Sequence, residues 1–249
     1  MTTAIGPVLW IAAQNGELSD VRKLLKCGGV DVEVKSGGMS SSSLHLAAKN
    51  GHLMVLLHLI EHGADVSVVD RDGWTPLHYA CYENRKSVLL ILLHHGADVN
   101  RADKSGVTPL MIAARNGFHT IAEILIHYNA DVHAKNAKSE NALHFAAARG
   151  HESLVQLLVE DGISVTCKST EGFTAGELAS FHTHSRITEM LKGFEFRRSH
   201  QSYRIQRVTA PIEIQTPLSL APKLLMPLIQ SFIKKISLKN ICLKRRISM

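Results

Sequence analysis

The pattern of apolar and polar positions is clearest between residues 73 and 99. Thr75 is a good helix N-cap, and Pro76 follows at the first helical position, where its missing N–H costs nothing. A short helix is predicted from there. A nearly continuous aliphatic run over 88–95 predicts a second helix, which ends at Gly96 because glycine can adopt the left-handed C-cap conformation. Neither helix is long enough to be stable alone in water, so the pair must pack against neighbours.

The same pattern recurs along the chain with a period of 33 residues. Three sets of positions keep this spacing without exception, namely Ala47, Ala80, Ala113, Ala146 and Ala179; Leu59, Leu92, Leu125, Leu158 and Leu191; and Leu44, Leu77, Leu110 and Leu143. A first copy lies 35 residues upstream, and a Gly- and Ser-rich loop over 30–43 carries the two additional residues. The last copy is weaker, with Gly176 in place of the leucine and Thr183 in place of a turn glycine. This repetition predicts a stack of helical units whose end copies face water on one side.

These copies resemble the ankyrin repeat, whose pattern is T-P-L-H-x-A-A-x-x-G-H, then an aliphatic helix ending in L-L, then G-A-D-V-N. The third copy reads TPLHYAC from Thr75, LL from Leu92 and GADVN from Gly96, and the second and fifth copies read LHLAA and LHFAA from Leu44 and Leu143. The resemblance covers about residues 7–192. It implies an all-α ankyrin solenoid, in which helix-turn-helix units are joined by β-hairpin loops.

The predicted domain organisation follows from these copies. The repeats are expected near 7–40, 41–73, 74–106, 107–139, 140–172 and 173–192, within an ankyrin-repeat domain over 1–192. Repeat five has Ser139, Asn141 and Ala142 where the family has Gly, Thr and Pro, which predicts a looser hairpin and N-cap. Residues 193–222 are polar, basic and interrupted by prolines, which predicts a flexible linker. Residues 223–249 are expected to form a basic amphipathic helix or a disordered tail.

Charge is unevenly divided between these parts. The chain has a net charge of +6, but residues 193–249 hold eleven Lys and Arg against two acidic residues, and residues 1–192 hold 17 against 20. The repeat domain is therefore mildly acidic, so no nucleic-acid binding is predicted for it. The four cysteines are widely spaced and form no CxxC pair. This favours a reducing compartment, so we expect a protein of the cytoplasm or also of the nucleus.

The sequence carries no catalytic fingerprint. It has no P-loop, GxSxG, HExxH or dinucleotide-binding glycine motif, so we expect neither an enzyme nor a cofactor. His45, His78 and His144 occupy the helix-start position of the repeat, where the resemblance implies a structural hydrogen bond. His58 and His62 stand four residues apart on a predicted helix, a spacing that could suit a metal. No third ligand converges on them in sequence, so no metal site is predicted.

Protein recognition is the function that remains. In ankyrin-like proteins, partners bind the hairpin tips and the concave face of the first helices. The corresponding residues here are Arg71, Asp72, Trp74, Tyr82, Glu83 and His95 in repeat three; Lys104, Val107, Arg115 and Asn116 in repeat four; and Lys138, Glu140 and Arg149 in repeat five. Because Trp, Tyr and Arg dominate interface energetics, Trp74 and Tyr82 are the preferred anchors, although Trp74 could instead cover a neighbouring hairpin. Asn100 also fits the pattern of ankyrin hairpins whose asparagine can be hydroxylated.

Three interpretations of the basic tail stay open. The stretch SLKNIC at 237–242 resembles the start of the elongin-binding box in the ankyrin and SOCS-box family. Leu238 and Cys242 would then bind elongin B/C, and the chain would be a substrate-recognition adaptor of an elongin/cullin ubiquitin ligase. The box departs from the family at Arg246, where an aliphatic residue is expected. Alternatively, the tail attaches the scaffold weakly to an anionic membrane surface or binds calmodulin, or it simply caps the last repeat.

Overall fold

The computed structural model describes residues 6–26, 31–35 and 40–201 of the chain. By its internal contacts the chain divides into two units, residues 1–202 and residues 203–249. The second unit lies outside the described residues. It includes residues 203–222 of the predicted linker and all of the predicted tail, so the predictions for those residues have no structural test.

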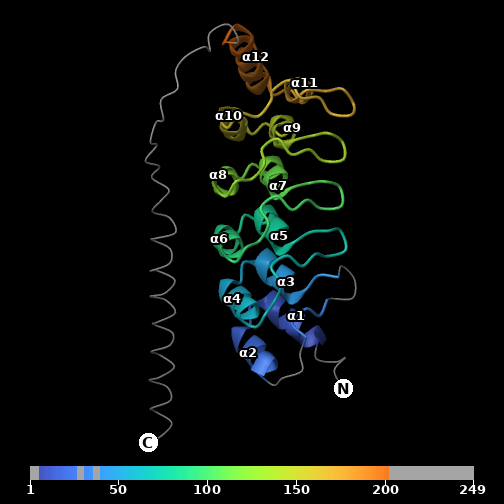
Figure 1. Ribbon diagram of the computed structural model, residues 1–249, viewed down its shortest axis with the longest axis vertical. Helices are drawn as coiled ribbons and strands as arrows, with labels where there is room; N and C mark the ends of the chain where they lie inside the picture. Colours follow the sequence, from blue (N-terminus) through green and yellow to red (C-terminus); the bar gives the residue numbers. More distant parts are fainter. Residues whose placement is uncertain (1–5, 27–30, 36–39, 202–249) are drawn as a thin grey trace, which may run out of the picture. The chain divides into compact units, whose positions relative to one another are not determined.

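Within the described ranges, twelve helices form six pairs (Figure 1). The first helices of the pairs are α1 (Gly6–Asn15), α3 (Ser43–Asn50), α5 (Pro76–Tyr82), α7 (Pro109–Asn116), α9 (Ala142–Ala148) and α11 (Ala175–Phe181). The second helices are α2 (Leu18–Lys26), α4 (Leu53–Glu61), α6 (Lys86–His94), α8 (His119–His127), α10 (Glu152–Glu160) and α12 (Ser185–Gln201). The loops that precede α5, α7, α9 and α11 project away from the second helices (Figure 1). The prediction of an all-α repeat solenoid is confirmed.

The positions that keep the 33-residue spacing form the core. All five alanines of the first set are fully buried, and the leucines of the other two sets are at most 1% exposed. Alanine lets successive first helices approach closely, while each buried leucine contributes roughly 1.5–3 kcal/mol through removal from water. No repeat can bury these side chains alone, so the interfaces between repeats hold the stack together.

A histidine connects each of three repeats to the next one. In repeat three, the backbone N–H of Thr75 donates to Nδ1 of His78 (3.1 Å), which leaves the proton of the neutral ring on Nε2. That Nε2–H donates to the carbonyl of Val107 in the following hairpin (3.3 Å). His45 and His144 make the equivalent bonds, as predicted. Repeat four has Met111 at this position, so its side chain donates no such bond to repeat five.

The departures in repeats five and six leave the backbone geometry of the repeat unchanged. The turn between the two helices needs a positive φ, which Gly150 supplies in repeat five (79°) and Thr183 supplies in repeat six (65°). The looser N-cap predicted for repeat five is wrong, because Asn141 accepts a hydrogen bond from the backbone N–H of His144. Its hairpin also closes normally, with the N–H of Asn136 bonded to the carbonyl of Glu140 (2.9 Å).

The last helix of the described residues is longer than predicted. The linker was predicted to begin at residue 193, but α12 continues to Gln201. Ile187 and Leu191 are buried at its start, and Phe194 packs against the core beyond the predicted boundary. Polar composition suggested a linker, whereas the Glu and Arg residues that produce it are also good helix formers.

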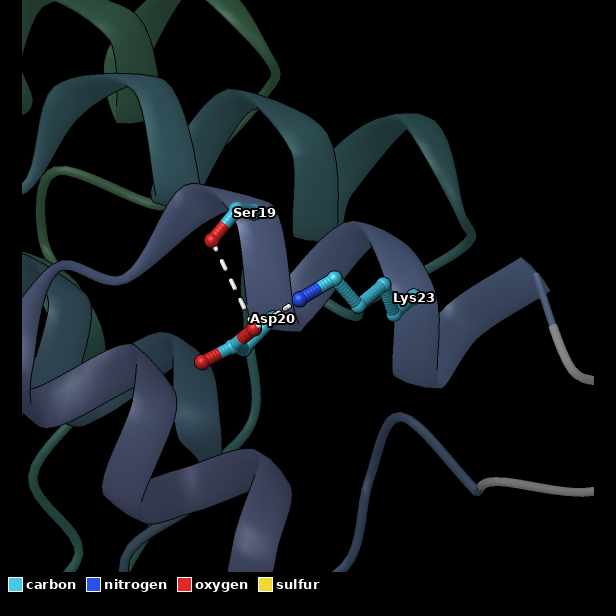
Figure 2. A network of polar contacts seen from close by, with 3 residues as sticks. All are labelled: Ser19, Asp20 and Lys23. Carbon is cyan, nitrogen blue, oxygen red and sulfur yellow. Dashed lines mark hydrogen bonds and ion pairs between the residues drawn. The ribbon is translucent and has the colours of Figure 1, made fainter.

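The outer surfaces of the second helices carry local polar contacts. In α2, Oδ1 of Asp20 accepts a hydrogen bond from the ammonium of Lys23 (2.7 Å), and Ser19 lies 3.4 Å from the same oxygen (Figure 2). The Lys23 ammonium lowers the pKa of the Asp20 carboxyl. Such exposed pairs between residues one turn apart add little to stability. In the described residues, no helix is both long enough and apolar enough to cross a bilayer.

Candidate protein-interaction surface

The hairpins form a hydrogen-bonded row along one side of the stack. Backbone N–H groups in each hairpin from repeat four onward donate to a carbonyl of the preceding hairpin: Lys104 to Asp72 (3.1 Å), Ala137 to Ser105 (2.9 Å) and Thr170 to Lys138 (2.8 Å). Beside this row lie the C-terminal ends of the first helices. We call the combined surface the hairpin-side face; it comprises residues 71–74, 104–107, 137–140 and 170–173 and residues 82–83, 115–116, 148–149 and 181–182.

An acceptor at the start of each hairpin fixes its shape. Oδ1 of Asp70 accepts the backbone N–H groups of Asp72 and Trp74 (both 2.9 Å). Asp103 and Asn136 repeat this arrangement one and two periods later. These positions were not among the predicted site residues. The signal that could have found them is a side chain with a hydrogen-bond acceptor at every 33rd residue, each five residues before a helix N-cap.

Tyr79 strengthens the hairpin of repeat three and was also missed. Its hydroxyl donates to Oδ2 of the buried Asp70 carboxyl (2.7 Å). Burial and this hydrogen bond raise the pKa of Tyr79 to about 12. Its ring also lies 5.1 Å from that of Trp74, centroid to centroid. Tyr79 therefore supports the preferred anchor from beneath rather than contacting a partner itself.

Trp74 makes structural contacts within the repeat domain. It is half-buried, and its indole N–H donates to the carboxylate of Asp103 in the next hairpin (3.1 Å). This matches the alternative interpretation, in which Trp74 covers a neighbouring hairpin. The ring of Tyr82 contacts it at 5.6 Å, and Tyr82 remains 43% exposed. Of the two preferred anchors, Tyr82 therefore offers the freer aromatic surface.

Several predicted binding residues present charged side chains on the hairpin-side face. Those with exposed or half-buried side chains are Arg71, Asp72, Glu83, Lys104, Arg115, Lys138 and Arg149. None of them takes part in an ion pair among the described residues. Their charges are therefore not neutralised within the repeat domain, which leaves them available to a partner.

Other predicted residues have structural contacts of their own. Asn116 donates from Nδ2 to the carbonyl of Tyr82 (3.3 Å) and so bridges repeats three and four. Val107 packs against the core, and Glu140 accepts a hydrogen bond from Asn136 within its own hairpin (2.9 Å). His95 lies at the C-cap of α6, a second helix, and is therefore not part of the hairpin-side face.

Two exposed aromatic residues of repeat six were missed. Phe173 is 44% exposed and Phe181 is 79% exposed. They stand three periods after Trp74 and Tyr82, so they occupy the same two positions of the repeat. The 33-residue spacing alone predicts this match, although repeat six departs from the leucine and glycine pattern at Gly176 and Thr183.

The remaining candidates do not form a chemical site. The rings of His58 and His62 lie 4.2 Å apart, but the described residues contain no group of three His, Cys, Asp or Glu side chains placed to hold a metal. The amide of Asn100 bonds to the carbonyl of Asn129 (3.2 Å) and to the N–H of Asp131 (2.7 Å), and so links repeats three and four. Leu238 and Cys242 lie outside the described residues, so elongin binding stays a prediction.

The geometry defines a class of protein, a solenoid of stacked helix pairs with a hydrogen-bonded row of hairpins. Comparison with protein families gives a more specific assignment. The family model described as "Ankyrin repeats (3 copies)" matches residues 9–103, 44–136 and 110–199. The chain therefore belongs to the ankyrin-repeat family, and its repeats support a role as a protein-interaction scaffold.

Individual relatives share only short segments with this chain. It is 48% identical over 62 residues to protein phosphatase 1 regulatory subunit 12A of Mus musculus, which is 24% of this chain and 6% of that protein. It is 41% identical over 66 residues to palmitoyltransferase AKR1 of Lachancea kluyveri, 26% of this chain and 9% of that protein. Human palmitoyltransferase ZDHHC13 is 35% identical over 66 residues, 26% of this chain and 10% of that protein. The chain thus spans a tenth or less of each relative, and none of these matches extends to a whole-protein activity.

Proposed function

We propose that the repeat domain is a non-enzymatic scaffold that binds a partner protein on the hairpin-side face. One observation carries this proposal. The residue at or near the end of each first helix from α3 onward changes from repeat to repeat, in the order Lys49, Tyr82, Arg115, Ala148 and Phe181. The alanine two residues earlier never changes and is always fully buried. The internal positions thus specify the fold, while the adjacent surface positions are free to specify a partner.

The hairpin row supports binding for an energetic reason. Association is weakened when loops and side chains must become ordered in the complex. Here backbone hydrogen bonds join each hairpin to the next, and acceptors such as Asp70 and Asp103 fix each turn. The face is therefore formed before a partner arrives, and little ordering is required of the loops.

The proposal is tested by affinity capture from cell extract with the full-length chain. Tyr82→Ala with Arg115→Ala removes two side chains of the hairpin-side face. Lys86→Ala with Lys192→Ala is the matched control, because both lysines are exposed and lie on second helices. We expect proteins retained by the wild type and the control to be lost from the face variant, with unchanged circular dichroism in all three. Equal recovery by the face variant would remove this surface as the binding site.

A further inference from the structure

The hairpin-side face has an aromatic pair at each end. Trp74 and Tyr82 form the first pair, in repeat three, and their rings are in contact at 5.6 Å. Phe173 and Phe181, at the same two positions of repeat six, are the second pair. Trp74 and Phe173 have equivalent backbone positions, because the carbonyl of each accepts a hydrogen bond from the structural histidine of the preceding repeat. The two pairs therefore lie on one strip of the hairpin-side face, which runs from repeat three to repeat six and is called the strip below.

Four basic side chains occupy the strip between the aromatic pairs. Lys104 and Lys138 project from the hairpin tips of repeats four and five, and Arg115 and Arg149 come from the ends of α7 and α9. They form two rows, one on each side of the strip. No ion pair neutralises them within the described residues.

The acidic groups are arranged differently. Between the pairs, the carboxylate of Asp103 accepts hydrogen bonds from the Trp74 indole and from two backbone N–H groups, and that of Glu140 bonds to Asn136. The acidic side chains that remain free on this face lie beside the aromatic pairs, at Asp72 and Glu83 in repeat three and at Glu171 in repeat six. Arg71 is a free basic side chain at the repeat-three end, where Asp72 and Glu83 outnumber it. The strip is therefore basic in its middle, and its ends carry more free acidic than basic side chains.

From this arrangement we infer that the hairpin-side face binds an extended acidic segment of a partner protein, held at each end by a large apolar side chain. The inference rests on the proposed function and adds the chemistry of the partner. Successive side chains of an extended chain point to opposite sides, so acidic residues along it reach both basic rows. The apolar side chains at its ends bury against the aromatic pairs, where Tyr82 and Phe181 supply the most exposed rings.

The spacing of the two apolar side chains follows from the packing of the helices. Neighbouring packed helices lie roughly 8–10 Å apart, so three repeat steps place the aromatic pairs about 25–30 Å apart. An extended chain rises about 3.3 Å per residue. The two apolar side chains of the partner are thus separated by about eight or nine residues, with the acidic residues between them.

The tail of this same chain is a poor match for the strip. Residues 193–249 carry a net charge of +9, which the unpaired lysines and arginines in the middle of the strip repel. Charge complementarity therefore favours an acidic segment from another protein.

The experiment is a selection of random 16-residue peptides displayed on phage against the immobilised full-length chain. We expect the enriched peptides to share two large apolar residues eight or nine positions apart, with Asp or Glu between them. Binding of the enriched peptides is then measured by fluorescence polarisation. Tyr82→Ser and Phe181→Ser should each weaken it at least tenfold, because anchor residues of this kind dominate interface energetics. Both residues are exposed, and circular dichroism verifies that each variant is folded.

A double charge reversal tests the basic middle of the strip independently of the aromatic pairs at its ends. Arg115→Glu with Lys138→Glu should weaken peptide binding at least tenfold and remove most of its sensitivity to salt, since opposite charges attract less as ionic strength rises. Lys86→Glu with Lys192→Glu changes the net charge equally on the second helices and should leave binding unchanged. If the two pairs weaken binding equally, the effect is one of net charge and the assignment of the basic strip is overturned.

Other results of the selection overturn the inference. Enriched peptides that are basic, or that depend on one aromatic pair only, contradict the two-anchor arrangement. If no peptide is enriched and lysine cross-linking joins Lys104 or Lys138 to residues 223–249 of the same chain, the tail is the occupant. If no peptide is enriched and capture from extract still depends on Tyr82 and Arg115, the scaffold function stands and its partner is not a linear segment.

Discussion

The indole nitrogen of Trp74 donates a hydrogen bond to the carboxylate of Asp103, the residue that organises the next hairpin. The positions equivalent to Trp74 hold Val107, Glu140 and Phe173, none of which can donate such a bond from an indole. Repeats three and four therefore have a side-chain connection that the later hairpins lack. It explains why a residue chosen as a binding anchor is only half exposed.

Trp74→Phe should lower the free energy of unfolding by about 1 kcal/mol, because it removes one hydrogen bond while retaining an aromatic ring. Denaturation by urea, monitored by far-ultraviolet circular dichroism, measures the change. Phe173→Leu is the control at the equivalent position of repeat six, where the ring is 44% exposed, and it should change stability by less than about 0.5 kcal/mol. An unchanged Trp74→Phe variant would show that the bond to Asp103 contributes nothing.

Stability should fall as the pH is lowered through the range below 6.5. Burial lowers the pKa of His78 to about 4 in the folded protein, against an ordinary value of 6.5. Between these values the unfolded chain binds the proton more readily, so the neutral ring stabilises the fold fully above pH 6.5 and loses this contribution as the pH falls. The loss from His78 is on the order of 3 kcal/mol at most, and the lowered pKa values of His45 and His144 act in the same direction.

His78→Met provides the matched comparison for this pH dependence, because Met111 fills the same position in repeat four. The variant should be less stable than the wild type at pH 7, where the histidine bond to Val107 is lost. Its stability should decline less steeply between pH 6.5 and pH 4.5. Parallel pH profiles for the two proteins would mean that His78 is not the group responsible.

Thr183→Gly should raise the free energy of unfolding by about 0.5–1 kcal/mol. Thr183 holds a φ of 65°, a left-handed conformation that is unfavourable for a β-branched residue and easy for glycine. The reverse substitution, Gly150→Thr, should destabilise the protein, because φ is 79° there and a Cβ would lie 2.7 Å from the ring of His184. Thermal unfolding of the two variants measures both effects. A destabilised Thr183→Gly protein would show that its hydroxyl bond to the His182 carbonyl outweighs the strain.

The two cysteines in the described residues should differ in reactivity. Cys81 is fully buried, and burial raises the pKa of its thiol, so little reactive thiolate is present. Cys167 is half-buried. Brief treatment with a maleimide, followed by peptide mass spectrometry, should find Cys167 modified and Cys81 unmodified until denaturant is added. Equal labelling of both in buffer would indicate that repeat three opens readily.

The sequence was sufficient to predict the period, the core and the caps of this fold. Ala80 and Leu92 belong to sets that recur without exception, and such sets can only be the buried contacts of a repeat. The end of α12 was predicted less well, because charged residues such as Glu and Arg are common both in linkers and in helices. The link from Trp74 to Asp103 could not be predicted at all. It depends on side-chain placement across two hairpins, and other repeats supply no precedent for it.

The candidate surface was predicted in part for a related reason. Arg115 and Tyr82 could be assigned from the repeat pattern alone, since the position in the repeat decides which side chains face outward. Asn116 and His95 were assigned in the same way, but Asn116 bonds to the carbonyl of Tyr82 in the preceding repeat, and His95 bonds to the carbonyl of Ile91 in its own helix. Phe173 and Phe181 were overlooked because sequence similarity weakens in repeat six, whereas the backbone geometry there does not.

Met111 interrupts a series that the histidines would otherwise continue. His45, His78 and His144 each bond their repeat to the next, so among the interfaces from repeat two to repeat six the one between repeats four and five lacks the histidine bond that the others have. In a stack whose cooperativity depends on nearest-neighbour contacts, the interface with the fewest bonds is where cooperative unfolding divides. We therefore expect amide hydrogen exchange to show two groups of repeats that unfold separately, repeats one to four and repeats five and six. In the Met111→His variant, all six repeats should exchange as one group.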